Sequence, residues 1–533
     1  MGRPPHRLRR AVAAVALAAA AAMSLDPPAR ASEPRPDIVL IVTDDQRWDS
    51  LDAMPILARE LVARGTTFAN AFATTPLCCP SRASILTGNL AHTTRVYRNA
   101  PPFGRYEWFD DRSTLATWLD DAGYATGYVG KYLNGYQHAA LTGVVPPGWD
   151  RWVAFVRPFY TDYALTVDGM VERDLATYAT DRLADEAVAF VEGAEGPLFL
   201  TFAPYAPHEP STPAPEDAAA VVPSRTSAPT VGEEDVSDKP AWVRALPPLD
   251  AGDRAALATI RTDADRSLLA VDRAIGRILD ALARAGRLDR TLVVFTSDQG
   301  LAYGEHRWTK KEAPYEEVIR VPLVIRAPEA FGAPTPATRT ELVANVDLAP
   351  TIAEFAGVAH PATDGTSLAP LLRGEVVAWR DAVLLEHLGG GTPVPSYCGV
   401  RTADAKYVRY GTGEEELYDL VADPFEATNL ADEPSALLDD LRSRTRTLCV
   451  PPPPGMEGGH ASGAWIAIAV LALLATAPVR YSPHGSPRRP GPPAADVGSQ
   501  PSCDVPPASA RRARRRARPR RWRVPRRPGP PRG

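Results

Sequence analysis

Short apolar runs alternate with longer amphipathic segments through the central part of the chain. The runs consist mostly of Val, Ile, Leu, Phe, Tyr and Thr, and they occupy residues 37–43, 124–129, 197–202, 291–296 and 321–325. A longer segment from Gly252 to Ala285 repeats its apolar residues at helical spacing and is followed by Gly286. A shorter helix is expected over residues 114–121, with Ser113 as its N-cap. Because the runs are apolar on both faces and helices separate them, the pattern predicts an α/β fold with a largely parallel sheet.

Polar residues follow directly after several of these runs. They are Asp44, Asp45, Lys131, His208, Asp298 and Gln299. Taken singly, each of them fits a turn, a helix cap or a solvated loop. Six such residues at one edge of the sheet indicate a binding site, because the ligand crevice of an open α/β sheet lies outside the carboxyl ends of its strands. The sequence therefore predicts a polar site at this edge.

The oxygen-bearing members of this set predict a metal site. Carboxylate and amide oxygens are hard ligands that suit Ca²⁺ or Mg²⁺ rather than zinc. The candidates are Asp44, Asp45, Asp298 and Gln299. Three carboxylates around one divalent ion leave net negative charge, which Arg82, Lys131 and Lys311 would offset when an anionic substrate binds. The implied chemistry is hydrolysis of a charged ester beside a metal ion.

Two adjacent cysteines stand in the stretch TTPLCCPSRASILTG, residues 74–88. Neighbouring cysteines rarely bond to each other, and the chain has no C-x-x-C spacing that would indicate zinc. Buried structural thiols are one interpretation. The other is functional: Pro80 suits the first turn of a helix, which would place Cys78 just before a helix N-terminus, where an anion is favoured.

The stretch from Cys78 to Arg82, with Leu86-Thr87-Gly88 at the expected distance, resembles the type I sulfatase signature C-x-P-S-R-x-x-x-L-T-G. Further similarity extends from about Asp37 to about Leu448, and Gly130-Lys131-Tyr132-Leu133-Asn134 is closest to the N-acetylglucosamine-6-sulfatase branch. The resemblance implies an alkaline-phosphatase-like fold, with a catalytic domain over residues 37–379 and a small α+β subdomain over residues 380–450.

The resemblance also implies a mechanism. In this family a formylglycine-generating enzyme oxidises the first cysteine of the motif to formylglycine (3-oxoalanine), so Cys78 is the modified residue and Cys79 the variable one. A hydroxyl of the hydrated aldehyde attacks the sulfur of the ester. The expected metal is Ca²⁺, with Mg²⁺ as the alternative, held by the modified Cys78 together with Asp44, Asp45, Asp298 and Gln299. The residues expected to bind the sulfate and the diol are Lys131, His208, Lys311 and Arg82.

Two positions depart from the family pattern. Many sulfatases have His two residues after the motif lysine, as the base that helps to release sulfate, whereas this chain has Leu133. Asn134 is not a base, so His92 and His306 are the remaining candidates for that role. At the last metal position Asn is common, whereas this chain has Gln299, whose extra methylene requires a shifted backbone or weakens the site.

The C-terminal part predicts a small sheet that contains a strand at residues 406–410 and is closed by a helix over residues 434–444. Cys398 and Cys449 are candidates for a disulfide, which an exported protein can form. The expected bridge would join the two ends of this subdomain, as in the C-terminal subdomain of sulfatases.

The favoured interpretation is a sulfatase that acts on sulfated small molecules or glycans, such as 6-sulfated N-acetylglucosamine, and two other classes of function are alternatives to it. One is a phosphate- or phosphonate-ester hydrolase of the same fold, which usually carries Thr or Ser as its nucleophile or binds two metals. The other is a non-catalytic protein that binds sulfated glycans. The motif cysteine and all metal carboxylates are present, which favours the enzyme.

The two ends of the chain differ from its body in composition. Residues 1–31 are typical of a secretory signal peptide, with a basic start, an apolar run and Ala29-Arg30-Ala31 as the cleavage site. The apolar residues 464–479 predict a membrane anchor that is shorter than the usual span, and the Pro- and Arg-rich residues 480–533 predict a disordered tail on the inner side. We therefore expect a secreted or cell-surface protein.

The net charge of −5 conceals an acidic body. From Arg488 onward the chain has 14 Arg and two Asp, and residues 1–31 have five Arg and one Asp, which leaves −21 for the body. An acidic body argues against nucleic acid as the partner.

Overall fold

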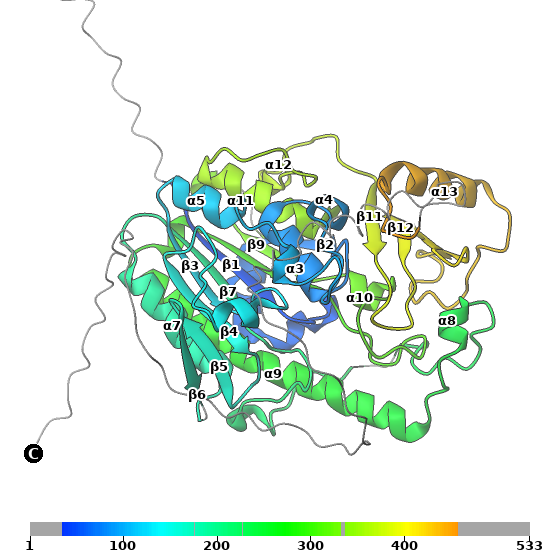
Figure 1. Cartoon of the computed structure of the whole chain (residues 1–533), viewed down its shortest axis with the longest axis horizontal. Coiled ribbons are helices and arrows are strands. Elements are labelled where there is room, and N and C mark those ends of the chain that lie inside the picture. Colours follow the sequence, from blue (N-terminus) through cyan, green and yellow to red (C-terminus); the bar gives the residue numbers. More distant parts are fainter. Residues whose placement is uncertain (1–34, 175, 226–227, 332–335, 457–533) are drawn as a thin grey trace, which may run out of the picture. The chain divides into compact units, whose positions relative to one another are not determined.

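A ten-stranded mixed sheet forms the centre of the protein in the computed structural model, which describes residues 35–456 apart from 175, 226–227 and 332–335 (Figure 1). The strand order is β10-β2-β9-β8-β1-β7-β3-β4-β5-β6. The central strands β8, β1, β7, β3 and β4 pair in parallel. Their bounds are Asp37–Thr43 (β1), Ala125–Gly130 (β3), Arg151–Arg157 (β4), Leu198–Ala203 (β7) and Thr291–Ser297 (β8). The remaining strands are Thr66–Phe72 (β2), Tyr163–Val167 (β5), Met170–Asp174 (β6), Leu323–Arg326 (β9) and Ala337–Ala344 (β10).

Helices cover both faces of this sheet, as Figure 1 shows. One face packs against Pro55–Glu60 (α2), Ala179–Gly193 (α7) and Ala251–Arg284 (α9). The other packs against Cys78–Thr87 (α3), Leu115–Asp121 (α5), Leu348–Ala356 (α11) and Ala369–Leu372 (α12). Because β1, β7 and β8 are buried along their whole length, their near-continuous apolar composition follows from contact with helices on both sides. Short helices complete this part: Ala91–Thr94 (α4), Tyr136–Ala140 (α6), Ala241–Arg244 (α8) and Glu316–Ile319 (α10).

The predicted largely parallel α/β sheet is confirmed, and the expected strands and the long helix begin and end within two residues of their predicted bounds. The predicted cap of α5 is wrong, because Thr114 and not Ser113 is the N-cap. The backbone N–H of Thr114 donates to the hydroxyl of Thr117 at 3.0 Å. The Ser113 hydroxyl instead accepts the indole N–H of Trp118 at 3.0 Å.

A separate four-stranded antiparallel sheet follows the large one in the sequence. Its strands are Ala382–His387 (β11), Tyr397–Thr402 (β12), Ala405–Tyr410 (β13) and Glu415–Asp419 (β14). Helix Ala436–Leu448 (α13) packs Leu438 and Leu441 onto this sheet, and it ends one turn later than the predicted helix. Cys398 and Cys449 form a disulfide with their Cα atoms 6.3 Å apart. The described residues belong to one compact unit, and the domain boundary between residues 379 and 380 stays a prediction.

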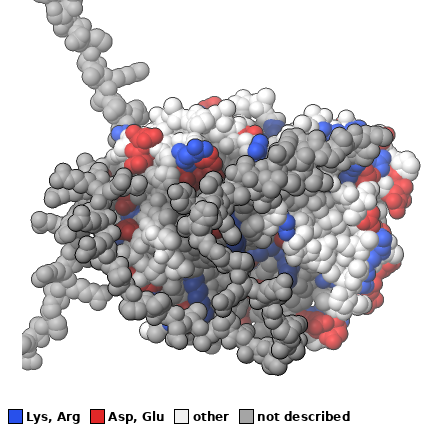
Figure 2. Space-filling view, viewed as in Figure 1, with Lys and Arg blue, Asp and Glu red and all other residues white. Residues whose placement is uncertain are grey.

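Basic and acidic side chains lie interspersed on the face drawn in Figure 2. Exposed ion pairs, such as Arg444 with Asp381 at 2.7 Å, are typical of the surface. Pairs of this kind contribute about 0–1 kcal/mol each. The predicted signal peptide, anchor and tail (residues 1–31, 464–479 and 480–533) lie outside the described residues. Within the part of the chain that the structure describes, no helix has the length and apolar character needed to cross a membrane.

Candidate active site

The parallel strands β1, β8 and β7 bring three polar segments to one edge of the sheet. Thr43 pairs with Ser297, so Asp44 and Asp298 leave their strands side by side. The Asp298 N–H donates to the Thr43 carbonyl at 3.1 Å. On the other side of β1, Asp44 forms an isolated parallel bridge with Pro207, next to His208. The sheet register thus places the residues that follow three distant runs beside one another, as the sequence predicts.

Helix α3 delivers Cys78 to this edge. The helix begins at Cys78 itself, after the extended N-cap Leu77, so the prediction that Cys78 precedes the helix is wrong by one position. Cys78 is buried, and its sulfur lies 3.7 Å from Oδ1 of Asp44 and 3.3 Å from Nε2 of Gln299. The Lys311 ammonium lies 3.0 Å from the same sulfur. Cys78 therefore sits at a helix N-terminus, among carboxylates and a cation.

Three buried carboxylates converge next to Cys78. One oxygen from each of Asp44, Asp45 and Asp298 lies within 4.8 Å of the others, which places them as a group that could hold a metal ion. Asp45 has a left-handed backbone with φ of 66°, and its N–H donates to Oδ1 of Asp298 at 3.1 Å. A non-glycine residue in this conformation is uncommon and is typically found at functional sites. The backbone is thus bent to turn the second carboxylate into the cluster.

Each of these carboxylates has a cationic neighbour. Lys131 forms an ion pair with Asp44, and Lys311 contacts both oxygens of Asp45 at 2.9 Å. Arg82 donates from Nε to Asp298 at 2.8 Å and from Nη1 to the Lys131 carbonyl at 2.7 Å. Two of the guanidinium nitrogens are therefore engaged in holding the site together, while Nη2 has no hydrogen-bond partner and lies 3.6 Å from Asp44.

Burial and mutual charge separate the pKa values of these groups. Burial disfavours the charged form of Asp44, but Lys131 and the other cations outweigh it and hold the pKa below its usual value. Burial and the adjacent charge of Asp44 raise the pKa of Asp298 to about 6, despite Arg82. Burial also raises the pKa of the Cys78 thiol, although Lys131 and Lys311 oppose the shift. Close carboxylates in a dry site repel one another, and a bound cation would remove that repulsion.

The residues present fit a hard divalent cation. The side chain of Gln299 lies against Asp45 and Cys78, and its Oε1 is a buried oxygen without a hydrogen-bond partner. A buried amide oxygen left unpaired is costly, and a metal ion is one partner that would satisfy it. Three carboxylates and an amide oxygen form the ligand type that Ca²⁺ or Mg²⁺ prefers. The longer side chain of Gln299 still reaches the cluster.

His208 presents its ring to the opposite side of the carboxylates. Its Nδ1 lies 2.7 Å from the Glu209 carbonyl, and its Nε2 lies 3.6 Å from Oδ2 of Asp45. Burial and, next, the charge of Lys311 lower the pKa of His208 to about 4, so the ring is neutral at pH 7. A carbonyl only accepts, which places the ring proton on Nδ1 and leaves a lone pair on Nε2 facing the cluster.

The other three candidate residues have their partners elsewhere. His92 pairs with Glu386 at 3.0 Å, and His306 pairs with Glu233 at 2.8 Å while its ring stacks on Tyr315. The Asn134 carbonyl accepts the Tyr106 N–H at 2.7 Å. Among the described residues, none of these contacts reaches Cys78, so the structure does not bring His92, His306 or Asn134 into the carboxylate cluster. Leu133, at the family's usual histidine position, packs in an apolar cluster with Tyr128 and Tyr132.

Several residues that contact the site are not predicted by the sequence. Tyr205 stacks on His208 with ring centroids 4.7 Å apart, and the Lys131 ammonium lies 5.6 Å from the Tyr205 ring. Asn99 accepts the Cys79 N–H at 2.8 Å through its side-chain oxygen. Ser81 donates to the Asp298 carbonyl and accepts from Asn345. Tyr205 precedes His208 by three residues, but its spacing alone does not indicate that the two rings stack.

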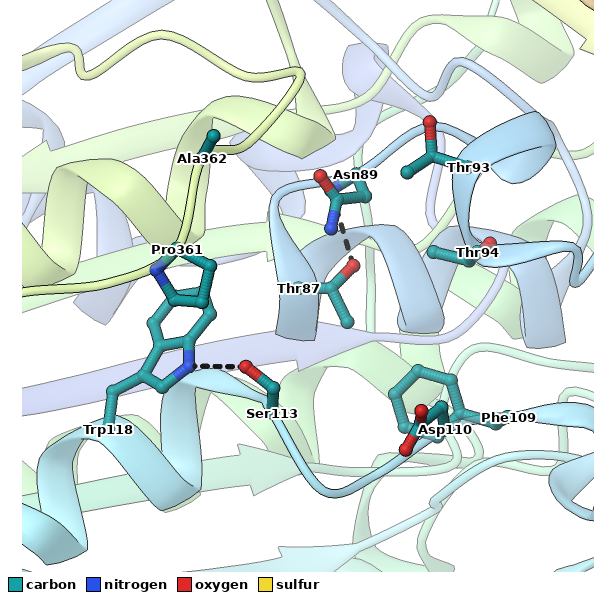
Figure 3. Close-up of a pocket in the computed structure, with 10 residues that line it drawn as sticks. All are labelled: Thr87, Asn89, Thr93, Thr94, Phe109, Asp110, Ser113, Trp118, Pro361 and Ala362. Carbon is teal, nitrogen blue, oxygen red and sulfur yellow. Dashed lines mark hydrogen bonds between the residues drawn. The ribbon is translucent and has the colours of Figure 1, made fainter.

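A cavity of about 200 Å³ lies at the far end of α3 and is drawn in Figure 3. Its lining residues include Thr87, Asn89 and Trp118, and the Thr87 hydroxyl accepts the Asn89 N–H at 3.2 Å. Thr87 ends the helix that Cys78 begins, nine residues away. At a rise of about 1.5 Å per residue the two ends are roughly 14 Å apart, so this cavity is separate from the carboxylate cluster.

Comparison with known proteins places the fold and site in one class, that of the sulfatases. The sulfatase family model matches residues 36–358, and the model of the C-terminal part of N-sulphoglucosamine sulphohydrolase matches residues 304–448. The chain therefore belongs to the sulfatase family, which indicates sulfuric ester hydrolase activity, and has the alkaline-phosphatase-like fold.

Individual relatives cover most of this chain. An N-acetylglucosamine-6-sulfatase of Homo sapiens is 32% identical over 74% of this chain and 81% of its own length. An extracellular sulfatase SULF-1 homolog of Drosophila melanogaster is 35% identical over 67% of this chain, which spans about a third (34%) of that longer relative. A solved structure in complex with its substrate D-glucosamine-2-N,6-O-disulfate has a TM-score of 0.68 and 26% identity, and the match covers 80% of this chain and 99% of that one.

Proposed function

We propose that this sulfatase hydrolyses the sulfate esters of sugars through a formylglycine made from Cys78 by a formylglycine-generating enzyme. The observation that carries the proposal is the position of Cys78 at the first turn of α3, with its sulfur 3.7 Å from Asp44 and 3.0 Å from Lys311. The hydrated aldehyde supplies the hydroxyl that attacks sulfur. Cys79 lies in an apolar cluster with residues such as Leu86 and Tyr132, which fits the variable position of the motif.

The proposed cofactor is one Ca²⁺ ion, with Mg²⁺ as the alternative. Asp44, Asp45, Asp298 and Gln299 would hold it together with an oxygen of the modified Cys78. Such an ion polarises sulfate oxygens and stabilises the negative charge that develops on them. Lys131 and Lys311 form ion pairs with Asp44 and Asp45 in this structure. Once these carboxylates bind the metal ion, the two ammonium groups would be free to bind the sulfate group of the substrate.

His208 is proposed to carry the proton. Its Nε2 lone pair faces the carboxylate cluster, so it accepts the proton that the attacking hydroxyl releases and then donates it to the oxygen of the departing alcohol. The hydrogen bond from Nδ1 to the Glu209 carbonyl and the stacked ring of Tyr205 fix the orientation of the imidazole. Arg82 positions Asp298 and the backbone of Lys131.

The proposed substrate class is 6-sulfated N-acetylglucosamine and related sulfated sugars. The relatives named for N-acetylglucosamine-6-sulfatase activity and the solved complex with a 6-O-sulfated glucosamine support this choice. The test is sulfate release from a panel of 6-, 4-, 3- and 2-sulfated sugars, an aryl sulfate and a phosphate monoester, with enzyme in which conversion of Cys78 has been verified. Turnover of a 6-sulfated glucosamine above the other sugars is expected. Preference for the phosphate ester would instead favour the phosphoesterase alternative.

The proposed location is outside the cytoplasm. Residues 1–31 have the pattern of a secretory signal, and the Drosophila relative is named as extracellular. Anchoring by residues 464–479 stays a prediction. Fractionation of the full-length protein beside a version stopped after Gly459 tests it: retention of the full-length protein alone in the membrane fraction is expected. If both proteins appear in the soluble extracytoplasmic fraction, residues 464–479 are no anchor.

A further inference from the structure

Unpartnered polar atoms gather next to Lys311 in a place that the proposed chemistry does not use. Oε2 of Glu312 and both ring nitrogens of His387 are buried and have no hydrogen-bond partner. Glu312 is 8% exposed and His387 is 1% exposed. Buried polar groups are almost always paired, and those left unpaired in a native structure call for a ligand, an ion or water. Glu312, the chain neighbour of Lys311, and His387 therefore indicate a place for a polar part of the substrate.

Glu312 is held firmly beside the catalytic cluster. Its N–H donates to the carbonyl of Pro76 at 3.0 Å, two residues before Cys78, and its own carbonyl accepts the Tyr397 hydroxyl at 2.9 Å. The backbone of Glu312 is left-handed, with φ of 80°. Since consecutive Cα atoms are about 3.8 Å apart, Glu312 begins one residue away from the lysine that contacts the Cys78 sulfur.

The second sheet supplies the other side of this cluster. His387 ends β11, and its ring lies 5.3 Å from the ring of Tyr397, the residue that holds the Glu312 carbonyl. The glycine-rich segment after β11 approaches the same carboxylate: a Cβ on Gly391 would lie 3.7 Å from Oε1 of Glu312. The C-terminal sheet therefore contributes a wall to the site that the large sheet forms.

Arg98 completes the cluster with a positive charge. A Cβ on Gly390 would lie 3.2 Å from Nη2 of Arg98, so the guanidinium rests against the glycine-rich segment. The next residue, Asn99, accepts the Cys79 N–H, which ties this arginine to the start of α3. Burial and then Arg98 lower the pKa of His387 to about 3, so its ring is neutral and offers one donor and one acceptor.

These groups match the hydroxyl edge of a sugar. The Glu312 carboxylate accepts hydrogen bonds, the Arg98 guanidinium donates them, and a neutral imidazole does both. A sugar hydroxyl also donates and accepts, whereas the ring of an aryl ester does neither. We propose that Glu312, His387 and Arg98 form a subsite that binds the unsulfated ring hydroxyls of the sugar and so selects sugar sulfates over aryl sulfates. The inference rests on the proposed sulfate-ester hydrolysis at Cys78.

The test is a thermodynamic cycle that compares kcat/KM after removal of the carboxylate charge, of a ring hydroxyl of the substrate, and of both. Glu312→Gln keeps the shape of the side chain, and the substrates are a 6-sulfated N-acetylglucosamine glycoside and its 3-deoxy and 4-deoxy analogues. In the unmodified protein, loss of the bound hydroxyl should lower kcat/KM by about tenfold or more, because a site built to bond a hydroxyl rejects an analogue that lacks it. In Glu312→Gln, removal of the same hydroxyl should lower kcat/KM by a factor at least about threefold smaller, since the interaction between the carboxylate and that hydroxyl is already gone.

Controls separate the possible failures. Glu433→Gln makes the same change at an exposed glutamate of the C-terminal subdomain and should show the full deoxy penalty. The ratio of kcat/KM for the sugar sulfate over 4-nitrophenyl sulfate should fall in Glu312→Gln and in the shorter variant Glu312→Asp. Equal losses with both esters, or deoxy penalties that Glu312→Gln does not change, would overturn the subsite. Failure of the unmodified, converted enzyme to release sulfate from any ester would instead overturn the proposed function.

Discussion

The ammonium group of Lys311 lies 3.0 Å from the sulfur of Cys78 and 2.9 Å from both carboxylate oxygens of Asp45. This one cation, 233 residues after Cys78 in the sequence, thus touches both Cys78 and a candidate metal ligand. Burial disfavours the charged lysine, yet Asp45 and the other anions raise the pKa of Lys311 well above its ordinary value. The lysine is therefore charged at any working pH and ready for an anionic substrate.

The two neighbouring cysteines should differ completely in their contribution to catalysis. Cys78→Ala should abolish sulfate release because the aldehyde precursor is gone, whereas Cys79→Ser should retain most of it. Mass spectrometry of the peptide that contains both residues should show a loss of about 18 Da at Cys78 in active protein, the difference between a thiol and an aldehyde side chain. Wild-type turnover by Cys78→Ala would show that the proposed mechanism is wrong.

Removal of the metal should stop the reaction reversibly. Treatment with a chelator should abolish sulfate release, and addition of Ca²⁺ should restore it. Asp298→Asn should weaken metal binding by at least about tenfold, because a charged ligand becomes a neutral one. Metal content at limiting free Ca²⁺, measured by atomic emission, checks this beside the exposed control Asp381→Asn. Equal metal content in the two variants would count against Asp298 as a ligand.

The contribution of His208 should depend on the leaving group. His208→Ala should lower kcat for a sugar sulfate by about 10²–10⁴-fold, the usual range for a lost general acid. The loss should be smaller for 4-nitrophenyl sulfate, since nitrophenolate departs without a proton. Sulfate release from both esters, measured with the same converted enzyme, provides the comparison. Equal losses would mean that His208 acts on the sulfate group alone.

Acid should destabilise the protein through His387. Burial and Arg98 hold the folded-state pKa of His387 at about 3, below the ordinary 6.5, so the unfolded chain binds this proton first as the pH falls. The free energy of unfolding should decrease below pH 6.5, by up to about 1.4 kcal/mol per pH unit from this residue, and should be unaffected by it above pH 6.5. Urea unfolding of the protein and of His387→Phe between pH 7 and pH 5 should show a shallower slope for the variant. Parallel slopes would contradict the prediction.

The disulfide between Cys398 and Cys449 should stabilise the C-terminal sheet. The two residues are 51 positions apart, and in the chain-entropy model a loop of that length corresponds to about 4 kcal/mol. Peptide maps with and without reduction should differ at these two cysteines, and Cys398→Ser with Cys449→Ser should lower the unfolding temperature. Identical maps would show that no bridge forms.

The strands were predictable because their apolar character repeats along short runs and depends little on distant residues. The polar residues at their ends were also predictable, since parallel strands must bring their carboxyl ends to one edge. The start of α3 was placed one residue late, because the extended Leu77 leads directly into the helix without a capping side chain. The sequence does not distinguish Ser113 from Thr114 as the cap of α5, because the indole of Trp118, which bonds the Ser113 hydroxyl, leaves the cap position to Thr114 only in the folded protein.

The local sequence by itself determined the strands of the large sheet, the motif that makes Cys78 the candidate for modification and the chemical types of the candidate metal ligands, because each depends on neighbouring residues. Tertiary structure alone decided which side chains meet. It directed His92 and His306 to Glu386 and Glu233, away from Cys78, and it brought the loop residue Glu312 and the β11 residue His387 to the same tyrosine, Tyr397. Contacts between residues far apart in the chain follow from how helices and sheets pack, and no local pattern encodes that packing.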